Sequence, residues 1–295
     1  MVTYFEMLLG DLLSTHYALF PGKLSKEKTF KYEDILRLET LDAITQQAIA
    51  DEVDALLRSG YQDLPNAFAK RTGIDTGEVK AHSTRMIELF ERRNIFVHNN
   101  GRIDNRYMKK VPNTYLKQIN ARENLLLAVP SSYVNEGIEA ILIVGTIISQ
   151  RIWRKYYKDC KLADYALTEL IFEKLVEGRY GLVINLADFA LNVAFSNKSS
   201  RYAVLINSAV AYDKLGDTIK KERTLHRIGN IHDLPIGQQV AYYCVSLEND
   251  RAVALLQKAI ATGDIDEVDL ADWPAFEYLA DDPAFEGIKR QMTHN

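Results

Sequence analysis

The sequence predicts an all-α protein, and three observations lead to that fold class. Apolar side chains recur at spacings of three and four residues over long stretches, which is the period of one helix face. No stretch of useful length alternates between apolar and polar residues as a half-buried strand would. Proline is scarce, with 7 residues, and glycine is modest, with 15, so long helices can run without interruption. The length of 295 residues favours two domains over one.

The composition excludes several classes of protein. Hydrophobic residues make up 47% of the chain and charged residues 26%, as in soluble globular proteins. The net charge of −4 is unlike that of a protein coating duplex DNA, so any nucleic-acid contact requires a local basic patch. The apolar run at 138–148 carries Glu139 and is too short to span a bilayer. With no pattern of a signal peptide, we expect a cytoplasmic protein that makes no membrane contact.

Cysteine usage predicts neither a metal centre nor a disulfide framework. The two cysteines, Cys160 and Cys244, lie far apart and have no histidine or cysteine neighbours at the spacing of metal ligands. We therefore expect two buried thiols in a reducing compartment, no metal site and no cofactor.

The first half, residues 1–125, is predicted to be a bundle of four or five helices. Breaker residues and apolar periodicity place them at about residues 4–20, 32–58, 64–71, 79–99 and 107–119. Pro21-Gly22, Ser59-Gly60 and Gly73 end the first three. Asn99-Asn100-Gly101 is a strong stop for the fourth, because asparagine and glycine tolerate the left-handed backbone that follows many helices.

The end of the fourth helix gathers the polar side chains that RNA cleavage requires. Asn94 and His98 are four residues apart and share a helix face, while Arg93 lies about 140° from His98 around the helix axis. A long arginine can still swing its guanidinium toward the imidazole. Arg93 could bind a phosphate, Asn94 could orient it, and His98 could move a proton near neutral pH. The alternative interpretation is an ordinary solvated basic helix end.

The residues around this helix end form a basic segment. Nine lysines and arginines lie between Arg85 and Arg122, against three acidic residues, for a local charge of +6. Tyr107 and Tyr115 are interspersed among them, and single-stranded RNA is bound by such combinations of charge and stacking rings. The predicted RNA-binding residues are Arg92, Arg102, Arg106, Tyr107, Lys109 and Lys110.

The phrase ERRNIFVHNNG, followed by NRY, resembles the motif of HEPN domains, which show an arginine, a polar residue, three further residues and a histidine at the end of a long helix. The resemblance covers residues 1–125, with Arg93 and His98 at the two catalytic positions and Asn94 at the polar one. It implies a metal-independent endoribonuclease that leaves 2′,3′-cyclic phosphate and 5′-hydroxyl ends. It also implies a homodimer in which two motifs build one composite site, and a role as a bacterial antiphage or toxin-type effector.

The resemblance leaves a non-catalytic alternative open, because some HEPN domains only dimerise or bind RNA. One subgroup of toxins carries a tyrosine two residues after the histidine, which its antitoxin adenylylates. Asn100 stands at that position here, which puts this form of control in doubt.

Residues 126–160 are interpreted as a connecting helix. Pro130-Ser131-Ser132 resembles a joint, and apolar residues at helical spacing run from about residue 134 to 157. The helix ends in a basic and aromatic stretch at 151–158. We interpret those long side chains as lying along the core with their charges in water, and the helix as a bridge between domains.

Residues 161–295 show a degenerate repeat, with turns that recur at about 34 to 38 residues near Gly178, Gly216 and Asn249. The predicted repeats are 164–197, 202–235 and 236–269, followed by an end cap at 273–285. They resemble tetratricopeptide repeats, although Lys221 stands where those have a small residue. The resemblance implies an α-solenoid whose groove binds a protein or peptide; a rigid scaffold that sets dimer geometry is the alternative.

The charge of the C-terminal region differs from that of the first half. Residues 248–286 hold eleven acidic residues and two basic ones, which should repel RNA and could mask the basic segment or receive a basic partner. Two functions follow from the whole sequence. The first is an RNA-cutting homodimer regulated through the helical repeats, and the second is a non-catalytic dimerising scaffold that binds RNA or protein.

Overall fold

The computed structural model describes residues 1–24, 28–58 and 60–292. Within these residues all regular structure is helical, apart from one isolated antiparallel bridge between Arg102 and Leu126, so the predicted all-α class is confirmed. The chain forms two compact units, Met1–Tyr156 and Tyr157–Asn295. Each is described separately below.

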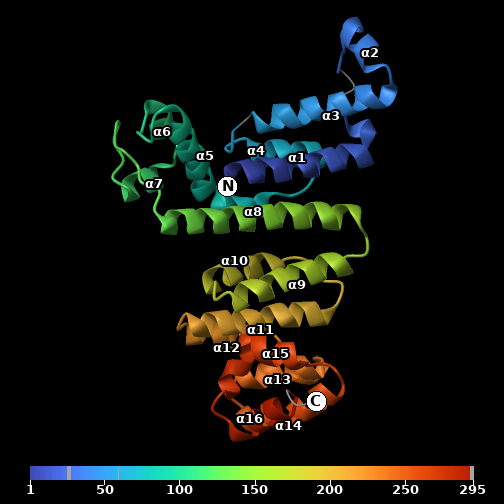
Figure 1. Ribbon diagram of the computed structural model, residues 1–295, viewed down its shortest axis with the longest axis vertical. Coiled ribbons are helices and arrows are strands. Elements are labelled where there is room, and N and C mark those ends of the chain that lie inside the picture. The colour runs from blue at the N-terminus through green and yellow to red at the C-terminus, as the bar shows by residue number, and fades with distance from the viewer. Residues whose placement is uncertain (25–27, 59, 293–295) are drawn as a thin grey trace. The chain divides into compact units, whose positions relative to one another are not determined.

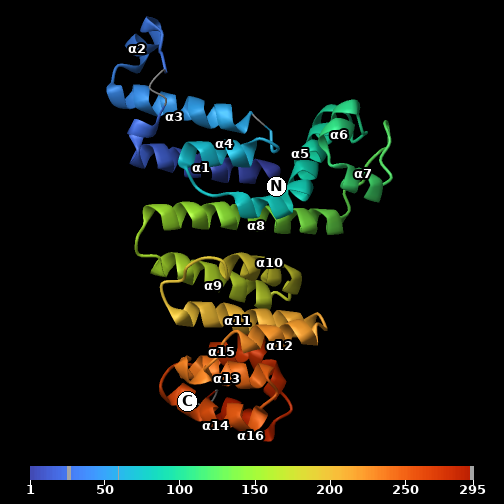
Figure 2. The ribbon, with the colours of Figure 1, turned by 180° about the vertical axis from the view of Figure 1, so that it is seen from behind.

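The first unit packs long helices in layers, with shorter helices at one end (Figures 1 and 2). Helix α1 contacts α3, α4, α5 and α8, and its residues Phe5, Leu9 and Leu13 are at most 1% exposed. The elements of the unit are α1 (Val2–Leu19), η1 (Pro21–Lys23), α2 (Tyr32–Leu38), α3 (Leu41–Leu57), α4 (Leu64–Thr72), η2 (Gly77–His82), α5 (Ser83–His98), α6 (Asn105–Lys110), α7 (Asn113–Gln118) and α8 (Ser131–Tyr156).

Two of the helices predicted from periodicity are each divided in the structure. The stretch 32–58 breaks at Glu39, whose φ of 60° is left-handed, and Thr40 then caps α3 by accepting a hydrogen bond from the amide of Ala43. The stretch 107–119 breaks at Val111, which is extended because it precedes Pro112. An apolar period persists across such breaks, so periodicity alone does not reveal them.

Helix α8 is part of the first unit and not a separate connector. It packs on α1, α5 and η2, and Val144 and Ile148 are completely buried. It is also the one helix in the described part of the chain that is long and apolar enough to cross a membrane, judged by length and composition alone. The sequence estimate that the apolar run is too short was therefore wrong about its length. Within the apolar 18-residue stretch of this helix, 44% is buried inside the structure.

The second unit contains three successive helix pairs followed by a cap of short helices. The two members of each pair contact one another, α11 contacts α9, and α13 contacts α11. The elements are α9 (Lys161–Val176), α10 (Tyr180–Ala190), α11 (Lys198–Lys214), α12 (Thr218–His226), η3 (Ile231–Asp233), α13 (Ile236–Val245), α14 (Asn249–Ala261), α15 (Glu267–Asp272), η4 (Pro274–Leu279) and α16 (Pro283–Met292).

The turns inside the three pairs share one backbone geometry. Each turn has one left-handed residue, which is Gly178, Gly216 or Leu247, with φ between 62° and 77°. Each also has the same set of backbone hydrogen bonds back to the end of the preceding helix. The third turn was placed near Asn249 from the sequence, but Asn249 is already the first residue of α14. Because Leu247 stands where the other turns have glycine, the sequence carried no glycine to mark it.

Replacing Leu247 by glycine is expected to stabilise the second unit. A left-handed leucine costs about 1–2 kcal/mol, and this side chain is 65% exposed, so little packing is lost. The greater freedom of glycine in the unfolded chain costs about 0.5–1 kcal/mol of stability. The substitution should therefore give a small net increase in the free energy of unfolding. Urea denaturation of Leu247→Gly beside Leu215→Gly provides the test, because Leu215 is similarly exposed but has φ of −89°. Equal shifts in the two variants would contradict the argument.

Lys221, which departs from the repeat pattern, is buried but paired. Its Nζ lies 2.9 Å from Oδ1 of Asp213, and the hydroxyl of Tyr278 donates to Oδ2 of the same carboxylate. Burial raises the pKa of Asp213, but these two hydrogen bonds outweigh it and hold the pKa below its ordinary value. Lys221 therefore connects α12 to α11, and the hydroxyl of Tyr278 connects the same carboxylate to η4 of the cap.

Candidate functional site

The C-terminal end of α5 is fixed by a hydrogen-bonded turn. The amides of Asn99 and Gly101 both donate to the carbonyl oxygen of Ile95, at 2.8 and 3.0 Å. Asn100 and Gly101 have φ of 47° and 75°, so the predicted left-handed stop is confirmed. Helix α5 therefore ends at His98, and the chain turns away directly after it.

The three predicted catalytic residues lie on this last part of α5. Arg93 and His98 are exposed and Asn94 is half-buried. Nη1 of Arg93 donates to Oδ1 of Asn94 at 3.2 Å, and Nδ2 of Asn94 donates to Oε2 of Glu91 at 3.4 Å. The structure thus brings Arg93 and Asn94 into contact. In the described part of the chain no hydrogen bond joins either of them to His98. Arg93 is separated from His98 around the helix axis, and the amide of Asn94, which shares the helix face of His98, is engaged by Arg93 and Glu91 instead.

Glu91 anchors this arrangement and also reduces the free positive charge beside it. Its side chain is 7% exposed; Oε2 lies 3.2 Å from Nε of Arg106, and Oε1 lies 3.5 Å from Nζ of Lys110. Arg106 and Lys110, two of the predicted RNA-binding residues, are therefore partly neutralised by one carboxylate. The guanidinium of Arg106 remains more than half exposed and can still reach an anion.

Two other predicted RNA-binding residues are corrected by the structure, because they lie inside the first unit. Arg92 is 6% exposed and Tyr107 is completely buried. Arg92 is four residues from Glu88 and shares its inward face, and Tyr107 lies on the face of α6 that packs against α5. Neither side chain can contact RNA in this fold.

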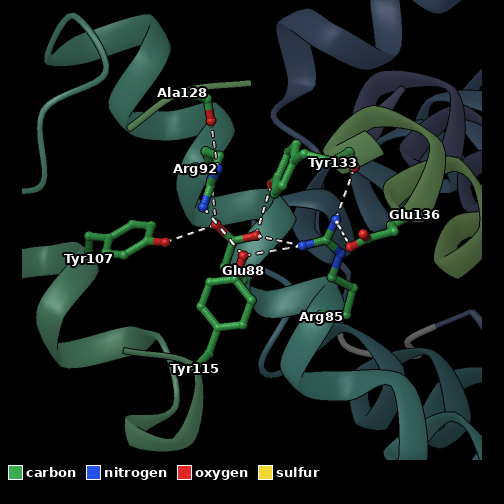
Figure 3. A network of polar contacts seen from close by, with 8 residues as sticks. All are labelled: Arg85, Glu88, Arg92, Tyr107, Tyr115, Ala128, Tyr133 and Glu136. Atoms are coloured by element: carbon green, nitrogen blue, oxygen red, sulfur yellow. Dashed lines mark hydrogen bonds and ion pairs between the residues drawn. The ribbon is translucent and has the colours of Figure 1, made fainter. Parts of the chain in front are cut away.

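These two residues belong to a buried polar network centred on Glu88, which is 0% exposed (Figure 3). Oε1 of Glu88 accepts from Nε of Arg92 and, at 2.8 Å, from the hydroxyl of Tyr107. Oε2 accepts from the hydroxyl of Tyr133 at 2.8 Å and lies 3.6 Å from Nη1 of Arg85. One carboxylate of α5 thus binds partners on α6 and α8 as well as on its own helix.

The outer partners extend the Glu88 network to α7 and to the segment before α8 (Figure 3). Arg92 donates to the carbonyl oxygen of Ala128 at 2.8 Å and to the hydroxyl of Tyr115 at 3.3 Å. The guanidinium carbons of Arg85 and Arg92 lie 4.3 and 4.0 Å from the ring centre of Tyr133. The buried charges of Glu88 and Arg92 are paired with each other and hydrogen-bonded to groups of the neighbouring segments. These contacts hold α5 in one position relative to α6, α7 and α8.

Burial, and next to it the negative charge of Glu88, raises the pKa of both Tyr107 and Tyr133 well above the ordinary value. Both hydroxyls therefore stay protonated and act as donors to the carboxylate. Sequence reasoning missed this network. The spacing of Glu88 and Arg92 was its one available signal, since four-residue pairs of opposite charge share a helix face.

Exposed cations and exposed apolar side chains surround the helix end. Lys109 is exposed and makes no ion pair in the described residues, and exposed Arg102 donates to the carbonyl oxygen of Asn124. Phe96, Val97 and Leu126 are 41%, 60% and 58% exposed. The ring of Phe96 lies over Gly101 at the surface. The site therefore combines Arg93 and His98 with an apolar strip beside them.

Replacing Gly101 by alanine is expected to destabilise the helix end. The left-handed φ of 75° strains any side chain, and a Cβ there would lie 3.1 Å from the ring of Phe96. We expect a loss of about 1–2 kcal/mol in the free energy of unfolding, measured by urea denaturation. Gly22→Ala is the matched control, because its Cβ would meet nothing within 4 Å. An unchanged midpoint for Gly101→Ala would show that the turn relaxes freely.

Among the described residues, no group of three or more histidine, cysteine, aspartate and glutamate side chains is placed to hold a metal ion. Both cysteines are free; Cys244 is buried, which raises its thiol pKa to about 12, but Cys160 is only half-buried, contrary to expectation.

Comparisons of the chain with protein-family models, curated proteins and solved structures found no match.

Proposed function

We propose that this protein is a metal-independent endoribonuclease that works as a homodimer in the cytoplasm and cuts RNA at the C-terminal end of α5. The hydrogen bond from Arg93 to Asn94, beside exposed His98 on a rigidly ended helix, is the observation that supports this function. A guanidinium, an orienting amide and an imidazole lie within six consecutive residues of α5, or about one and a half helical turns. The buried Glu88 network behind them holds that turn in place.

The proposed reaction uses the 2′-hydroxyl of the RNA as the nucleophile. Its oxygen attacks the phosphorus, the bond from phosphorus to the 5′-oxygen breaks, and the products carry a 2′,3′-cyclic phosphate and a 5′-hydroxyl. Arg93 binds the non-bridging phosphate oxygens, where negative charge grows in the transition state. His98 removes the proton from the 2′-hydroxyl or gives one to the departing 5′-oxygen.

A homodimer follows from the number of proton-transfer groups. Cleavage needs one base and one acid, and the α5 end of a single chain presents one imidazole, that of His98. A second copy supplies the other imidazole if the two α5 ends face each other. Val97 lies between Arg93 and His98 in sequence and is 60% exposed, so the same contact buries apolar surface. The second copy is therefore the occupant that we assign to the strip formed by Phe96, Val97 and Leu126.

The experiment uses the purified full chain with single-stranded RNA in EDTA, so that no free divalent metal contributes. We expect cleavage, 5′-hydroxyl ends that polynucleotide kinase can label, and 3′ ends that need cyclic-phosphate opening before ligation. Light scattering should give the mass of a dimer. RNA that stays intact, or a protein that is a monomer at micromolar concentration, contradicts the proposal.

The second candidate function is a dimerising scaffold that binds RNA or a protein without cutting. The observation that favours it is the reduced basic patch, since Arg92 is buried and Glu91 pairs with Arg106 and Lys110. RNA binding without cleavage in the same assay would support it.

In either function we propose that the second unit receives the regulatory partner, as a bacterial antiphage or toxin-type effector would require. Its acidic stretch at 248–286 favours a basic protein segment.

A further inference from the structure

The first unit also contains a cavity of about 710 Å³ away from α5. It lies where the C-terminal ends of α1, α4 and α8 meet, with Phe20, Thr72 and Tyr156 among its lining residues. Figures 1 and 2 show that this end of α1 and α8 is opposite the end beside α5. The cavity is therefore separate from the candidate ribonuclease site.

The wall of this cavity is strongly basic. Four cations, Lys23, Lys70, Arg71 and Lys155, line it together with a single acid, Glu52. Nε of Arg71 lies 3.2 Å from Oε2 of Glu52, so that pair is neutral. Lys23 and Lys70 are exposed and form no ion pair in the described residues. An excess of three positive charges thus converges on one concave site, in a chain whose net charge is −4.

Lys155 is fixed in this wall by the end of α4. Its Nζ donates to the carbonyl oxygens of Thr72 and Gly73, at 2.7 and 2.6 Å. An ammonium has three N–H donors, so one remains for a ligand. A side chain at Gly73 would collide with this ammonium, because a Cβ would lie 2.7 Å from Nζ. The glycine therefore provides both the left-handed end of α4 and the space that Lys155 occupies.

Aromatic rings also line the cavity. The ring centres of Phe20 and Tyr156 are 5.1 Å apart, and Phe20 is 41% exposed. The ring of His16 stacks on Tyr156 with an interplanar angle of 19°. A flat ligand ring can extend such a stack, since stacking on aromatic side chains does not require a particular base.

The imidazole of His16 holds Tyr156 in this wall. The His16 side chain is 2% exposed, and its Nδ1 is hydrogen-bonded to the hydroxyl of Tyr156. Burial lowers the pKa of the imidazole, an effect larger than the opposing contribution of the hydrogen bond with the Arg71 backbone. The neutral ring therefore extends the aromatic part of the cavity wall.

We propose that this cavity binds a nucleoside phosphate. The phosphate is held by Lys23, Lys70 and the free N–H of Lys155, and the base stacks against Phe20 and Tyr156. The volume is within the range of sites that enclose ligands of this size. The cations and the aromatic rings line one cavity, so the site combines groups that bind a phosphate with groups that stack on a base.

The test is calorimetric titration of the full chain with AMP, adenosine and inorganic phosphate as separate probes. The protein carries Arg93→Ala and His98→Ala, so that the candidate ribonuclease site does not contribute. We expect AMP to bind at least tenfold more tightly than either part alone. Lys70→Glu should weaken AMP binding at least tenfold, and Phe20→Ala should weaken AMP without changing the affinity for phosphate.

Lys80→Glu is the matched control, because Lys80 is an exposed lysine of the same unit that forms no ion pair in the described residues and does not line the cavity. It should leave AMP binding unchanged. Equal weakening by Lys80→Glu and Lys70→Glu would reveal general charge attraction and overturn the proposal. So would phosphate binding as tightly as AMP, adenosine binding as tightly as AMP, or no heat with AMP at millimolar concentration. None of these outcomes depends on whether the protein cleaves RNA.

Discussion

Arg93→Ala and His98→Ala are each expected to lower the rate of RNA cleavage by roughly 10²- to 10⁴-fold while the protein stays folded. Both side chains are exposed, and among the described residues the hydrogen bond of the Arg93 side chain goes to Asn94, so their removal leaves the core unchanged. Loss of Arg93 removes the charge that stabilises the phosphate oxygens, and loss of His98 removes the group that transfers the proton. Single-turnover cleavage of a labelled RNA in EDTA measures both effects.

The chain offers matched controls for these variants on α12. His226 is an exposed histidine at the last residue of its helix, as His98 is, and Arg223 is an exposed arginine one turn earlier. His226→Ala and Arg223→Ala should cleave at the wild-type rate. If the α5 and α12 variants lose activity equally, or if neither α5 variant loses it, the assignment of Arg93 and His98 is wrong.

The composite nature of the site is tested by mixing the two inactive variants. Half of the subunit pairs formed from Arg93→Ala and His98→Ala chains combine one intact Arg93 with one intact His98. Such a pair keeps one arginine and one imidazole, so partial activity above that of either variant alone is expected if both chains build one site. Light scattering and urea midpoints at the wild-type values show that exchange, and not refolding, causes any recovery.

Glu88→Ala is expected to have the largest effect on stability, a loss of about 3–5 kcal/mol in the free energy of unfolding. The substitution leaves the guanidinium of Arg92 buried without its counter-charge and removes the acceptor of two tyrosine hydroxyls. It also breaks the link from α5 to α6 and α8. A urea denaturation curve followed by circular dichroism should show the first unit unfolding at a much lower midpoint.

Two further variants separate the network from a general effect of removing a glutamate. Glu123→Ala removes an exposed, unpaired glutamate of the same unit and should shift stability by less than about 0.5 kcal/mol. Arg92→Ala alone should be strongly destabilising, yet adding it to Glu88→Ala should cost much less, because the charge left unpaired is gone. If Glu88→Ala behaves like Glu123→Ala, or the two effects simply add, the network does not hold α5 as described.

Local signals in the sequence were enough to predict the all-α class and the position at which α5 ends. Helical periodicity follows from a chain that must bury one face of each helix, and it located the helices without tertiary information. The stop at Asn99-Asn100-Gly101 depends on backbone sterics of those residues themselves, and their φ angles agree with it. The chain position of the Arg93, Asn94 and His98 cluster is likewise a property of a single helix.

Tertiary packing decided which charged residues of that helix face inward. Arg92 and Arg93 are neighbours of one type, and the sequence assigned both to an RNA site. Arg92 is buried because Glu88, Tyr115 and the carbonyl of Ala128 surround its guanidinium, and two of those partners come from distant segments. A buried charge is stable only where such partners converge, so its position depends on the whole fold. For the same reason, packing alone showed that α8 belongs to the first unit and that Arg93, not Arg92, is free to meet a ligand.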